Sequence, residues 1–317
     1  MKKTIDKCQL IAESDSPVMI YGETGTGKEL FAQSIHNASR RCNGPFIAIN
    51  CAAIPSTLLE SMLFGTEKGA YTGAIQREGV LEQANGGTLL LDEINSMDIT
   101  LQSKLLRVLQ DGMIRRVGGL SDIHVDVRII SNTNIPPMQA VEQNQLRKDL
   151  YFRLGVVNIT IPPLRERKED IPLLSKTFIM AGNEKIRKNA SGLDSKTMQI
   201  FIAYDWPGNV RELQHAIEYA LNILPHEMDK ILPEYIPDHI INAVGTEKLD
   251  SIQQQAGSMT VHEAMQQAAR QCILQALEDN DGNISRTARQ VGLTRQNLQH
   301  YIKKLHINHA ETPDKQP

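Results

Sequence analysis

Two groups of residues in this sequence have the types and spacing that phosphate chemistry requires. The first is the glycine-rich stretch made of Gly22, Glu23, Thr24, Gly25, Thr26, Gly27, Lys28 and Glu29. Glycines allow backbone N–H groups to curl around a polyphosphate, and the lysine ammonium can reach the terminal phosphates. The second is the acidic pair Asp92 and Glu93, which follows the apolar run at residues 89–91. Asp92 could hold Mg²⁺ on the β- and γ-phosphates, and Glu93 could orient and deprotonate the attacking water.

The sequence on both sides of the glycine-rich stretch predicts a phosphate-binding loop. Residues 18–21 form a short apolar run typical of a buried strand, and residues 30–36 have helical spacing of apolar side chains. A strand, a glycine loop, a lysine and a helix in this order predict a nucleotide site. A chance glycine turn is the alternative, and the two flanking elements disfavour it. Glu29 stands where Ser or Thr usually follows the lysine, so this position offers no hydroxyl ligand for Mg²⁺.

The rest of the N-terminal half alternates between strand and helix patterns. Strands are expected at residues 46–50, 88–93, 125–131 and 156–161, and helices at residues 55–64 and 101–111. This alternation indicates an α/β fold with a mainly parallel sheet and helices on both faces. Thr133 and Asn134 end one strand pattern and could bring polar groups to the γ-phosphate region. A simple turn would have the same sequence.

Strand patterns stop at Pro162 and Pro163, and helical patterns follow. Helices are expected around residues 171–181, 195–204, 210–224, 260–279 and, as two short ones, 282–307. Residues 245–257 are polar and weakly patterned, which is typical of a linker. The predicted division is a nucleotide-binding α/β domain at 1–165, a helical domain at 166–242, a linker at 243–258 and an all-α domain at 259–317.

The last of these domains has the pattern of a DNA-binding helix-turn-helix. Ile284, Ala288 and Val291 would face inward, and Gly292 would make the turn. Side chains able to contact base edges and phosphates would face outward, namely Arg286, Arg295, Gln296, Gln299, His300 and Lys303. The alternative is a basic solvated face on a small bundle. The long helix at 260–279 would pair with its twin in a dimer, which fits a two-fold site on double-stranded DNA.

Composition and charge agree with a globular protein that has one polyanion-binding end. The 317 residues are 41% hydrophobic and 22% charged with a net charge of −3, yet residues 282–308 carry five Lys or Arg and no acid. No apolar run approaches a membrane span and no signal peptide is present, so a cytoplasmic location without a membrane partner is expected. The cysteines lack metal-type spacing and are expected to be reduced thiols, at Cys8, Cys42, Cys51 and Cys272.

Six stretches together resemble one family, the bacterial enhancer-binding proteins, which are AAA+ transcription activators of sigma-54 RNA polymerase. The matching stretches are residues 22–29, 69–74, 86–94, 147–153, 162–171 and 206–213. Within the family, residues 59–66 and 92–97 are most similar to the RocR-type regulators of arginine utilisation. The C-terminal pattern resembles the Fis-type module of these activators, and the helical domain at 166–242 resembles their lid.

The resemblance implies roles for residues that spacing alone leaves open. Glu29 is usual in the family, and Asn50 would hold the catalytic Glu93 in check until the γ-phosphate is sensed. Arg147 and Arg153 are six residues apart, so by themselves they fit a solvated helix end or a contact with a neighbouring subunit's γ-phosphate. The resemblance implies the second, as arginine fingers acting in trans. It also implies that Arg211 senses nucleotide from the lid, and that the active form is a ring, expected to be a hexamer.

The most specific of the six stretches is the loop made of Gly69, Ala70, Tyr71, Thr72, Gly73 and Ala74. A glycine-bounded tip with one aromatic side chain can present an amphipathic ring to a partner. In the family, where Phe replaces Tyr71, this loop contacts sigma-54 and moves with the hydrolysis cycle. An ordinary glycine-rich surface turn is the alternative.

The predicted function is therefore ATP- and Mg²⁺-dependent activation of sigma-54 RNA polymerase from an upstream DNA site, by remodelling closed promoter complexes into open ones. One rival is a regulator that binds DNA and nucleotide without remodelling sigma-54, and another is a general protein-unfolding ATPase. The family's core normally begins before Met1, with a hydrophobic-glycine segment beside the adenine and often a sensory domain. Either the chain starts at an internal Met, or nucleotide affinity is reduced. The sequence does not reveal the signal, the target genes or the ring size.

Overall fold

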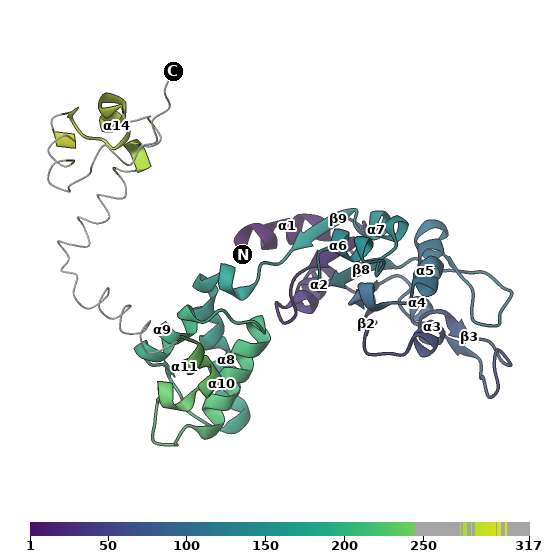
Figure 1. The fold of residues 1–317 in the computed structure, drawn as a ribbon. Helices are drawn as coiled ribbons and strands as arrows, with labels where there is room; N and C mark the ends of the chain where they lie inside the picture. Colours follow the sequence, from purple (N-terminus) through teal and green to yellow (C-terminus); the bar gives the residue numbers. More distant parts are fainter. Residues whose placement is uncertain are drawn as a thin grey trace. The chain divides into compact units, whose positions relative to one another are not determined.

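The computed structural model describes residues 1–244, 273, 275–277, 280, 283–295, 297–298 and 302. The chain divides into two compact units, residues 1–244 and residues 245–317, and each is described by itself (Figure 1). Among the described residues, no helix has the length and hydropathy needed to cross a bilayer.

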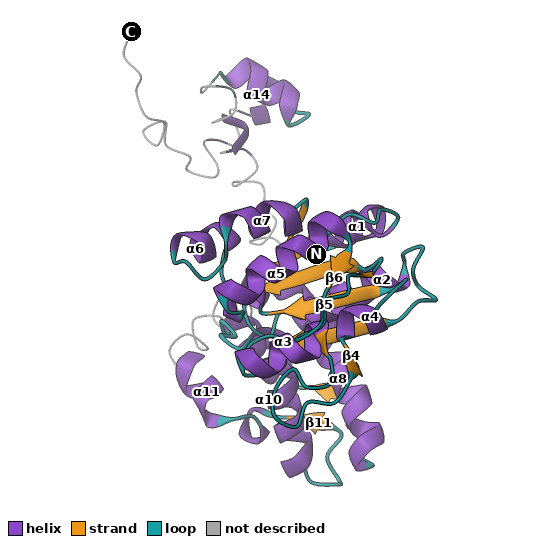
Figure 2. Ribbon diagram, turned by 90° about the vertical axis from the view of Figure 1, so that its right-hand side faces the viewer, coloured by secondary structure: helices purple, strands orange, loops and turns teal. Residues whose placement is uncertain are grey.

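A five-stranded sheet forms the centre of the first unit. Its strands lie in the order β2 (Phe46–Asn50), β5 (Thr88–Asp92), β8 (Arg128–Thr133), β1 (Val18–Tyr21) and β9 (Val157–Thr160). All four neighbouring pairs are parallel. Figure 2 shows the strands lying between helices. The α/β fold class predicted from the sequence is confirmed, and all five predicted strands are present.

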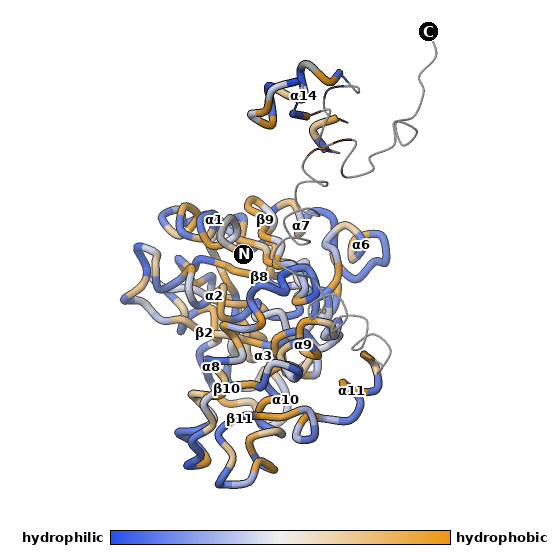
Figure 3. Tube along the Cα trace, turned by 90° about the vertical axis from the view of Figure 1, so that its left-hand side faces the viewer, coloured by the Kyte–Doolittle hydropathy of each residue, from blue (hydrophilic) through white to orange (hydrophobic). Residues whose placement is uncertain are grey.

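Alternating side chains of the strands enter two separate cores, one on each face of the sheet. Val18 and Leu90 pack with buried residues of α1 (Lys2–Ala12) and α2 (Lys28–Asn37). Met19 and Leu89 point the other way, into a larger core. Five helices contribute to that core, α3 (Ser56–Phe64), α4 (Val80–Gln83), α5 (Ile99–Asp111), α6 (Pro137–Glu142) and α7 (Lys148–Leu154). Figure 3 shows the hydropathy of each residue along the chain, with hydrophilic residues frequent in the connecting loops.

The strand expected at residues 125–131 is shifted toward the C-terminus in the structure. β8 is completely buried although it ends with Ser131, Asn132 and Thr133. Because these three residues are polar, the apolar pattern used to predict strands did not include them all. Its first residue, Arg128, is 2% exposed and donates to the carbonyls of Ile11 and Ala12, at 2.9 and 3.1 Å. The guanidinium thus satisfies carbonyls at the C-terminus of α1, a helix that the sequence analysis did not anticipate.

Two hairpins project from the same end of the sheet domain in Figure 1. The first joins β3 (Gly65–Thr66) to β4 (Arg77–Glu78), ahead of the short helix α4 (Val80–Gln83). The second joins β6 (Met113–Ile114) to β7 (Ile123–His124). A β-bridge between Thr66 and Val117 connects the two hairpins, so they form one structure.

The helical lid follows the sheet within the same unit. Its helices are α8 (Ile171–Ile186), α9 (Ser195–Ala203), α10 (Asn209–Ile223) and α11 (Asp238–Val244). Short 3₁₀ turns lie before and within the lid at Leu164–Glu166, Lys168–Asp170 and Pro233–Tyr235, and another follows β5 of the sheet at Ile94–Ser96. No strand was predicted in this region, but the structure has a small parallel pair, β10 (Gly192–Leu193) and β11 (Lys230–Ile231). Trp206 is fully buried in the lid core and donates its indole N–H to the Phe201 carbonyl at 2.7 Å.

The described part of the second unit contains α14 (Ile284–Gln290) and the turn after it. Ala288 and Leu298 are buried with Ile273 and Leu277, and Val291 packs against them. Gly292 has φ of 69°, the left-handed conformation that a glycine adopts without strain. Arg286 and Arg295 are exposed, as expected for DNA contacts. Gln296, Gln299, His300, Lys303, most of the helix predicted at 260–279 and nearly all of the predicted linker lie outside the described residues.

Candidate nucleotide and partner sites

The glycine-rich loop leaves β1 and enters α2 at Lys28, as predicted. Gly25 and Gly27 have φ of 81° and 96°, values that residues other than glycine rarely adopt. Within the described part of the chain, the N–H groups of Thr24, Gly25 and Gly27 have no hydrogen-bond acceptor. Unpaired backbone donors at the start of a helix are suited to binding phosphate oxygens.

Lys28 is only 8% exposed and its ammonium lies on the loop itself. Its Nζ donates to the carbonyl of Gly22 at 2.7 Å and to that of Glu23 at 3.2 Å. Burial lowers the pKa of Lys28, while the nearby charges of Asp92 and Glu93 raise it in part. The two acids and the lysine therefore share one site.

Asp92 ends β5 and is held by amides from both neighbouring strands. Asn132 Nδ2 donates to Asp92 Oδ1 at 3.1 Å, and Asn50 Nδ2 lies 3.5 Å from Oδ2. The resemblance implied that Asn50 restrains Glu93, whereas the hydrogen bond in this structure is to Asp92. Asn132 was missed from the sequence, where the only signal was a polar residue directly before Thr133.

Glu93 lies directly beyond the strand in a strained backbone conformation. Its φ and ψ are 53° and 50°, a left-handed conformation that costs a non-glycine residue on the order of 1 kcal/mol. No described residue forms a hydrogen bond with its half-buried carboxylate. The turn therefore gives the Glu93 carboxylate surroundings that differ from those of the hydrogen-bonded Asp92.

Thr133 and Asn134 reach the same edge of the sheet. The Thr133 carbonyl accepts from the N–H of Gly22 at 3.3 Å, and its hydroxyl donates to the carbonyl of Ile135 at 2.8 Å. Asn134 Oδ1 accepts from Asn95 Nδ2 at 3.3 Å, just past the acidic turn. The carboxyl ends of β1, β2, β5 and β8 thus bring the predicted nucleotide-site residues of the sheet domain together.

The lid contacts this edge through the start of α10. The Arg211 N–H donates to the carbonyl of Gly25 at 3.3 Å, and the charge of its guanidinium lowers the pKa of Lys28. Glu23 was predicted to bind nucleotide with the rest of the loop, but its carboxylate is engaged by Arg165 and Asn209. Glu29 is exposed in the first turn of α2, where a negative charge is favourable.

Of the predicted trans-acting arginines, Arg153 lies in α7 and Arg147 is the residue directly before this helix, and both make local contacts. Arg147 forms a two-pronged pair with Asp149, at 3.0 and 2.7 Å. Arg153 donates from Nε and Nη2 to the carbonyl of Leu109, at 3.0 and 2.7 Å. No hydrogen bond in the described part of the chain links either arginine to the chain's own glycine-rich loop.

Residues 69–74 form a tight turn at the tip of the first hairpin. Ala74 N–H donates to the Tyr71 carbonyl at 2.9 Å, and Gly69 N–H to the Ala74 carbonyl at 3.4 Å. Tyr71 is 55% exposed, and neighbouring Ile75 is 73% exposed. Gly118 of the second hairpin lies so close that an added Cβ would meet Ala70 at 2.6 Å. The turn therefore exposes aromatic and aliphatic surface at the tip of a hairpin that packs against the second hairpin.

Arg116 of the second hairpin forms two ion pairs near this contact. It pairs with Glu82 at 2.7 Å and with Glu67 at 3.2 Å. Burial opposes ionisation of Glu82, but hydrogen bonds from Arg116 and from the Gly79 N–H outweigh burial and lower its pKa. This mostly buried pair connects the second hairpin to α4, and the pair with Glu67 connects it to the first hairpin.

Glu82→Gln is expected to destabilise the protein by roughly 2 kcal/mol, because it removes the closer of the two countercharges of Arg116 and weakens charge-assisted hydrogen bonds. The depressed pKa of Glu82 means that its contribution is present above the ordinary glutamate pKa and is lost as the pH falls through the folded value. Urea unfolding at pH 7 and at pH 4 measures this difference. Asp122→Asn, which breaks the exposed pair with Arg115, is the matched control and should change little. Equal effects of the two changes would contradict the role of Glu82.

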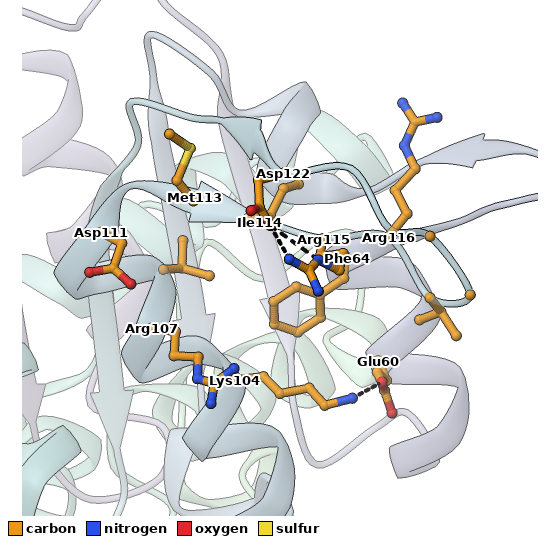
Figure 4. A pocket seen from close by; sticks show the side chains of 14 residues that line it. Glu60, Phe64, Lys104, Arg107, Asp111, Met113, Ile114, Arg115, Arg116 and Asp122 are labelled. Carbon is orange, nitrogen blue, oxygen red and sulfur yellow. Dashed lines mark hydrogen bonds and ion pairs between the residues drawn. The ribbon is translucent and has the colours of Figure 1, made fainter.

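A pocket of about 580 Å³ lies beneath the second hairpin, between α3 and α5 (Figure 4). Its wall carries two ion pairs, Lys104 with Glu60 at 2.5 Å and Arg115 with Asp122 at 2.8 Å. None of its lining residues belongs to the predicted nucleotide site, so it is a separate feature. Among the described residues, no group of three or more His, Cys, Asp or Glu side chains could hold a metal by itself. A Mg²⁺ bound by one carboxylate, water and phosphate oxygens needs no such group.

Comparison with protein families identifies the fold and its order of domains. Residues 1–160 match the family described as the sigma-54 interaction domain. The chain belongs to the sigma-54 interaction domain family. Residues 165–252 match the AAA+ ATPase lid domain, and residues 265–305 match the bacterial regulatory protein, Fis family. The resemblance to sigma-54 enhancer-binding activators, the AAA+ ATPase class and the Fis-type helix-turn-helix are thereby confirmed.

Relatives in the sigma-54 interaction domain family align with nearly the whole of this chain. The transcriptional activator RocR of Bacillus subtilis is 46% identical over 308 residues, which cover 96% of this chain and 66% of RocR. The regulatory protein AtoC of Escherichia coli is 43% identical, over 95% of this chain and 65% of AtoC. This chain thus spans about two thirds of these relatives' length. The crystal structure of NtrX from Brucella abortus with ADP has a TM-score of 0.72 and 33% identity, over 96% of this chain and 68% of NtrX.

Proposed function

We propose that this protein is a sigma-54-dependent transcription activator in the cytoplasm. It binds double-stranded DNA upstream of a promoter through its Fis-type domain, and it hydrolyses ATP with Mg²⁺ at the boundaries of a homo-oligomeric ring. The loop at residues 69–74 transmits each hydrolysis cycle to sigma-54, which opens the promoter complex. The observation that carries the proposal is the meeting of the glycine-rich loop, Asp92 and Glu93 at one sheet edge, in a chain of this family.

The side chains of the site have the arrangement that ATP hydrolysis needs. Lys28 would exchange the carbonyls of Gly22 and Glu23 for phosphate oxygens, which are stronger acceptors. The amides of Asn50 and Asn132 fix the orientation of Asp92, an oxygen ligand suited to Mg²⁺. Mg²⁺ would supply charge neutralisation on the β- and γ-phosphates.

The remaining groups would act on the attacking water and on the developing charge. Glu93, whose carboxylate has no described hydrogen-bond partner, would orient this water and accept its proton. Arg153 would leave the carbonyl of Leu109 and reach the γ-phosphate of the adjacent subunit, together with Arg147 at the start of the same helix as its N-cap residue. Thr133, Asn134 and Arg211 would report the presence of the γ-phosphate to the sheet edge and the lid.

ATP-dependent open-complex formation with sigma-54 holoenzyme tests the proposal. A promoter with an upstream site is melted only when this protein and hydrolysable ATP are both present, and a non-hydrolysable analogue gives no melting. Binding of DNA and nucleotide without melting would instead identify a regulator that does not remodel sigma-54. Hydrolysis without salt-dependent DNA binding would identify a general protein-unfolding ATPase.

Tyr71→Ala is expected to abolish promoter opening and to leave ATP hydrolysis within about twofold of the wild type. The ring is 55% exposed at the loop tip and far from the phosphate loop in sequence, so its removal takes away partner surface only. Permanganate footprinting and phosphate release measure the two activities. Tyr71→Phe keeps the aromatic surface and serves as the control, with opening retained. If Tyr71→Ala opens promoters normally, the contact lies elsewhere.

A further inference from the structure

Four consecutive residues of the glycine-rich loop are held from the lid side. Asn209 Nδ2 donates to the carbonyl of Thr24 at 3.0 Å and to Glu23 Oε2 at 3.2 Å. The N–H of Val210 donates to the carbonyl of Gly25 at 3.0 Å. A guanidinium nitrogen of Arg167 donates to the carbonyl of Thr26 at 3.0 Å. All of these donors come from residues 167–210, more than 140 positions later in the chain.

Asn209 is the centre of this contact. Its side chain is fully buried, and its Oδ1 accepts the N–H of Leu164 at 2.8 Å while its Nδ2 faces the loop. Its φ of 53° is one that asparagine tolerates better than most residues. One side chain therefore connects the loop, the segment before the lid and the first turn of α10.

A second connection is the ion pair between Glu23 and Arg165. Two guanidinium nitrogens of Arg165 contact the two carboxylate oxygens, at 2.5 and 2.8 Å. The backbones also touch, because a Cβ added at Gly25 would lie 2.2 Å from the carbonyl oxygen of Gly208. Glu23 therefore faces the lid and not the phosphate position.

These contacts determine where the loop's donors point. In a trans peptide the carbonyl and the following N–H point in opposite directions. Holding the Thr24 carbonyl toward the lid turns the N–H of Gly25 away from it, and holding the Thr26 carbonyl does the same for Gly27. These two N–H groups are among those without an acceptor in the described part of the chain.

We propose that Asn209, Arg167 and the Glu23–Arg165 pair are positioning residues that aim the phosphate-binding N–H groups of the glycine-rich loop. Movement of the lid then changes the loop's affinity for polyphosphate directly, in addition to any contact that the lid makes with nucleotide. The inference rests on the proposed nucleotide site, and it assigns Glu23 a role different from that of a nucleotide ligand.

Glu23→Gln separates this role from simple electrostatics. Removal of a negative charge beside a phosphate site should by itself strengthen ATP binding, because it weakens the Coulomb repulsion of the phosphates. The positioning role predicts the opposite, a Kd for a fluorescent ATP analogue with Mg²⁺ about five- to tenfold higher, because a charge-assisted bidentate pair is weakened. Arg165→Gln should give a similar increase, and the double variant should be no weaker than either single variant.

Asn209→Asp keeps the shape and the Oδ acceptor but loses both donors to the loop, and at least about a tenfold increase in Kd is expected. Since Asn209 is buried, melting temperatures accompany each measurement, and the half-exposed Arg165 provides the test if Asn209→Asp does not fold. Arg115→Gln breaks an ion pair in the hairpin and should leave the Kd unchanged.

Each outcome bears on one of the two proposals. Wild-type protein that binds no ATP analogue overturns the proposed function and this inference with it. Wild-type binding with unchanged or tighter binding by folded Glu23→Gln overturns the positioning role alone, as do additive effects of Glu23→Gln and Arg165→Gln. Weaker binding in both single variants without additivity supports it.

Discussion

Glu93→Ala is expected to bind ATP as the wild type does and to hydrolyse it at least about a hundredfold more slowly, since a positioned general base contributes that much or more. The carboxylate follows Asp92 directly, yet the left-handed turn at Glu93 gives it separate surroundings. Asp92 keeps its two amide contacts in the variant, so the Mg²⁺ ligand remains in place. Phosphate release and the affinity for a fluorescent ATP analogue measure the two properties.

Glu78→Ala is the matched control, because Glu78 is an exposed glutamate on β4 outside the site. Its turnover should equal that of the wild type. Wild-type turnover in Glu93→Ala would remove Glu93 from the mechanism. Loss of nucleotide binding together with turnover would show that the turn has a structural role.

The sheet was predictable because its strands are short apolar runs that leave little choice of structure. β1 and β2 begin and end where the sequence placed them. β8 did not, because its polar end is stabilised by hydrogen bonds that no local pattern reveals. One example is the contact of Asn132 with Asp92, which are 40 positions apart.

The site was predictable to the extent that its motifs are local. The glycine-rich loop and the acidic pair are each contiguous, so their types and spacing indicated their chemistry. The surroundings of Glu23 were not predictable, because its partner Arg165 lies 142 positions away and only the folded lid brings it close. The same holds for Arg116, which no local pattern singles out and which joins the second hairpin to Glu67 of the first hairpin and to Glu82 of α4.

Arg153→Ala is expected to lower ATP hydrolysis by about a thousandfold, which is the lower end of the effect of an arginine finger. In this structure Arg153 is exposed and bonded only to the carbonyl of Leu109 among the described residues. Its removal breaks two exposed hydrogen bonds at the end of α5, so the free energy of unfolding should change little. Under the proposed function, the variant would also remove a positive charge from the neighbouring subunit's site. Arg77→Ala, an exposed arginine on β4, is the control and should hydrolyse ATP normally.

Mixing two inactive variants shows whether Arg153 acts on its own subunit or on the next one. Subunits with Arg153→Ala retain Lys28 and Glu93, and subunits with Glu93→Ala retain Arg153. In a ring assembled at random from equal amounts, about a quarter of the boundaries combine an intact Glu93 with an intact neighbouring Arg153. Hydrolysis should therefore recover to about a quarter of the wild-type rate if boundaries act independently. A mixture no more active than its separate components would contradict action in trans, because only a site shared between subunits can be repaired in this way.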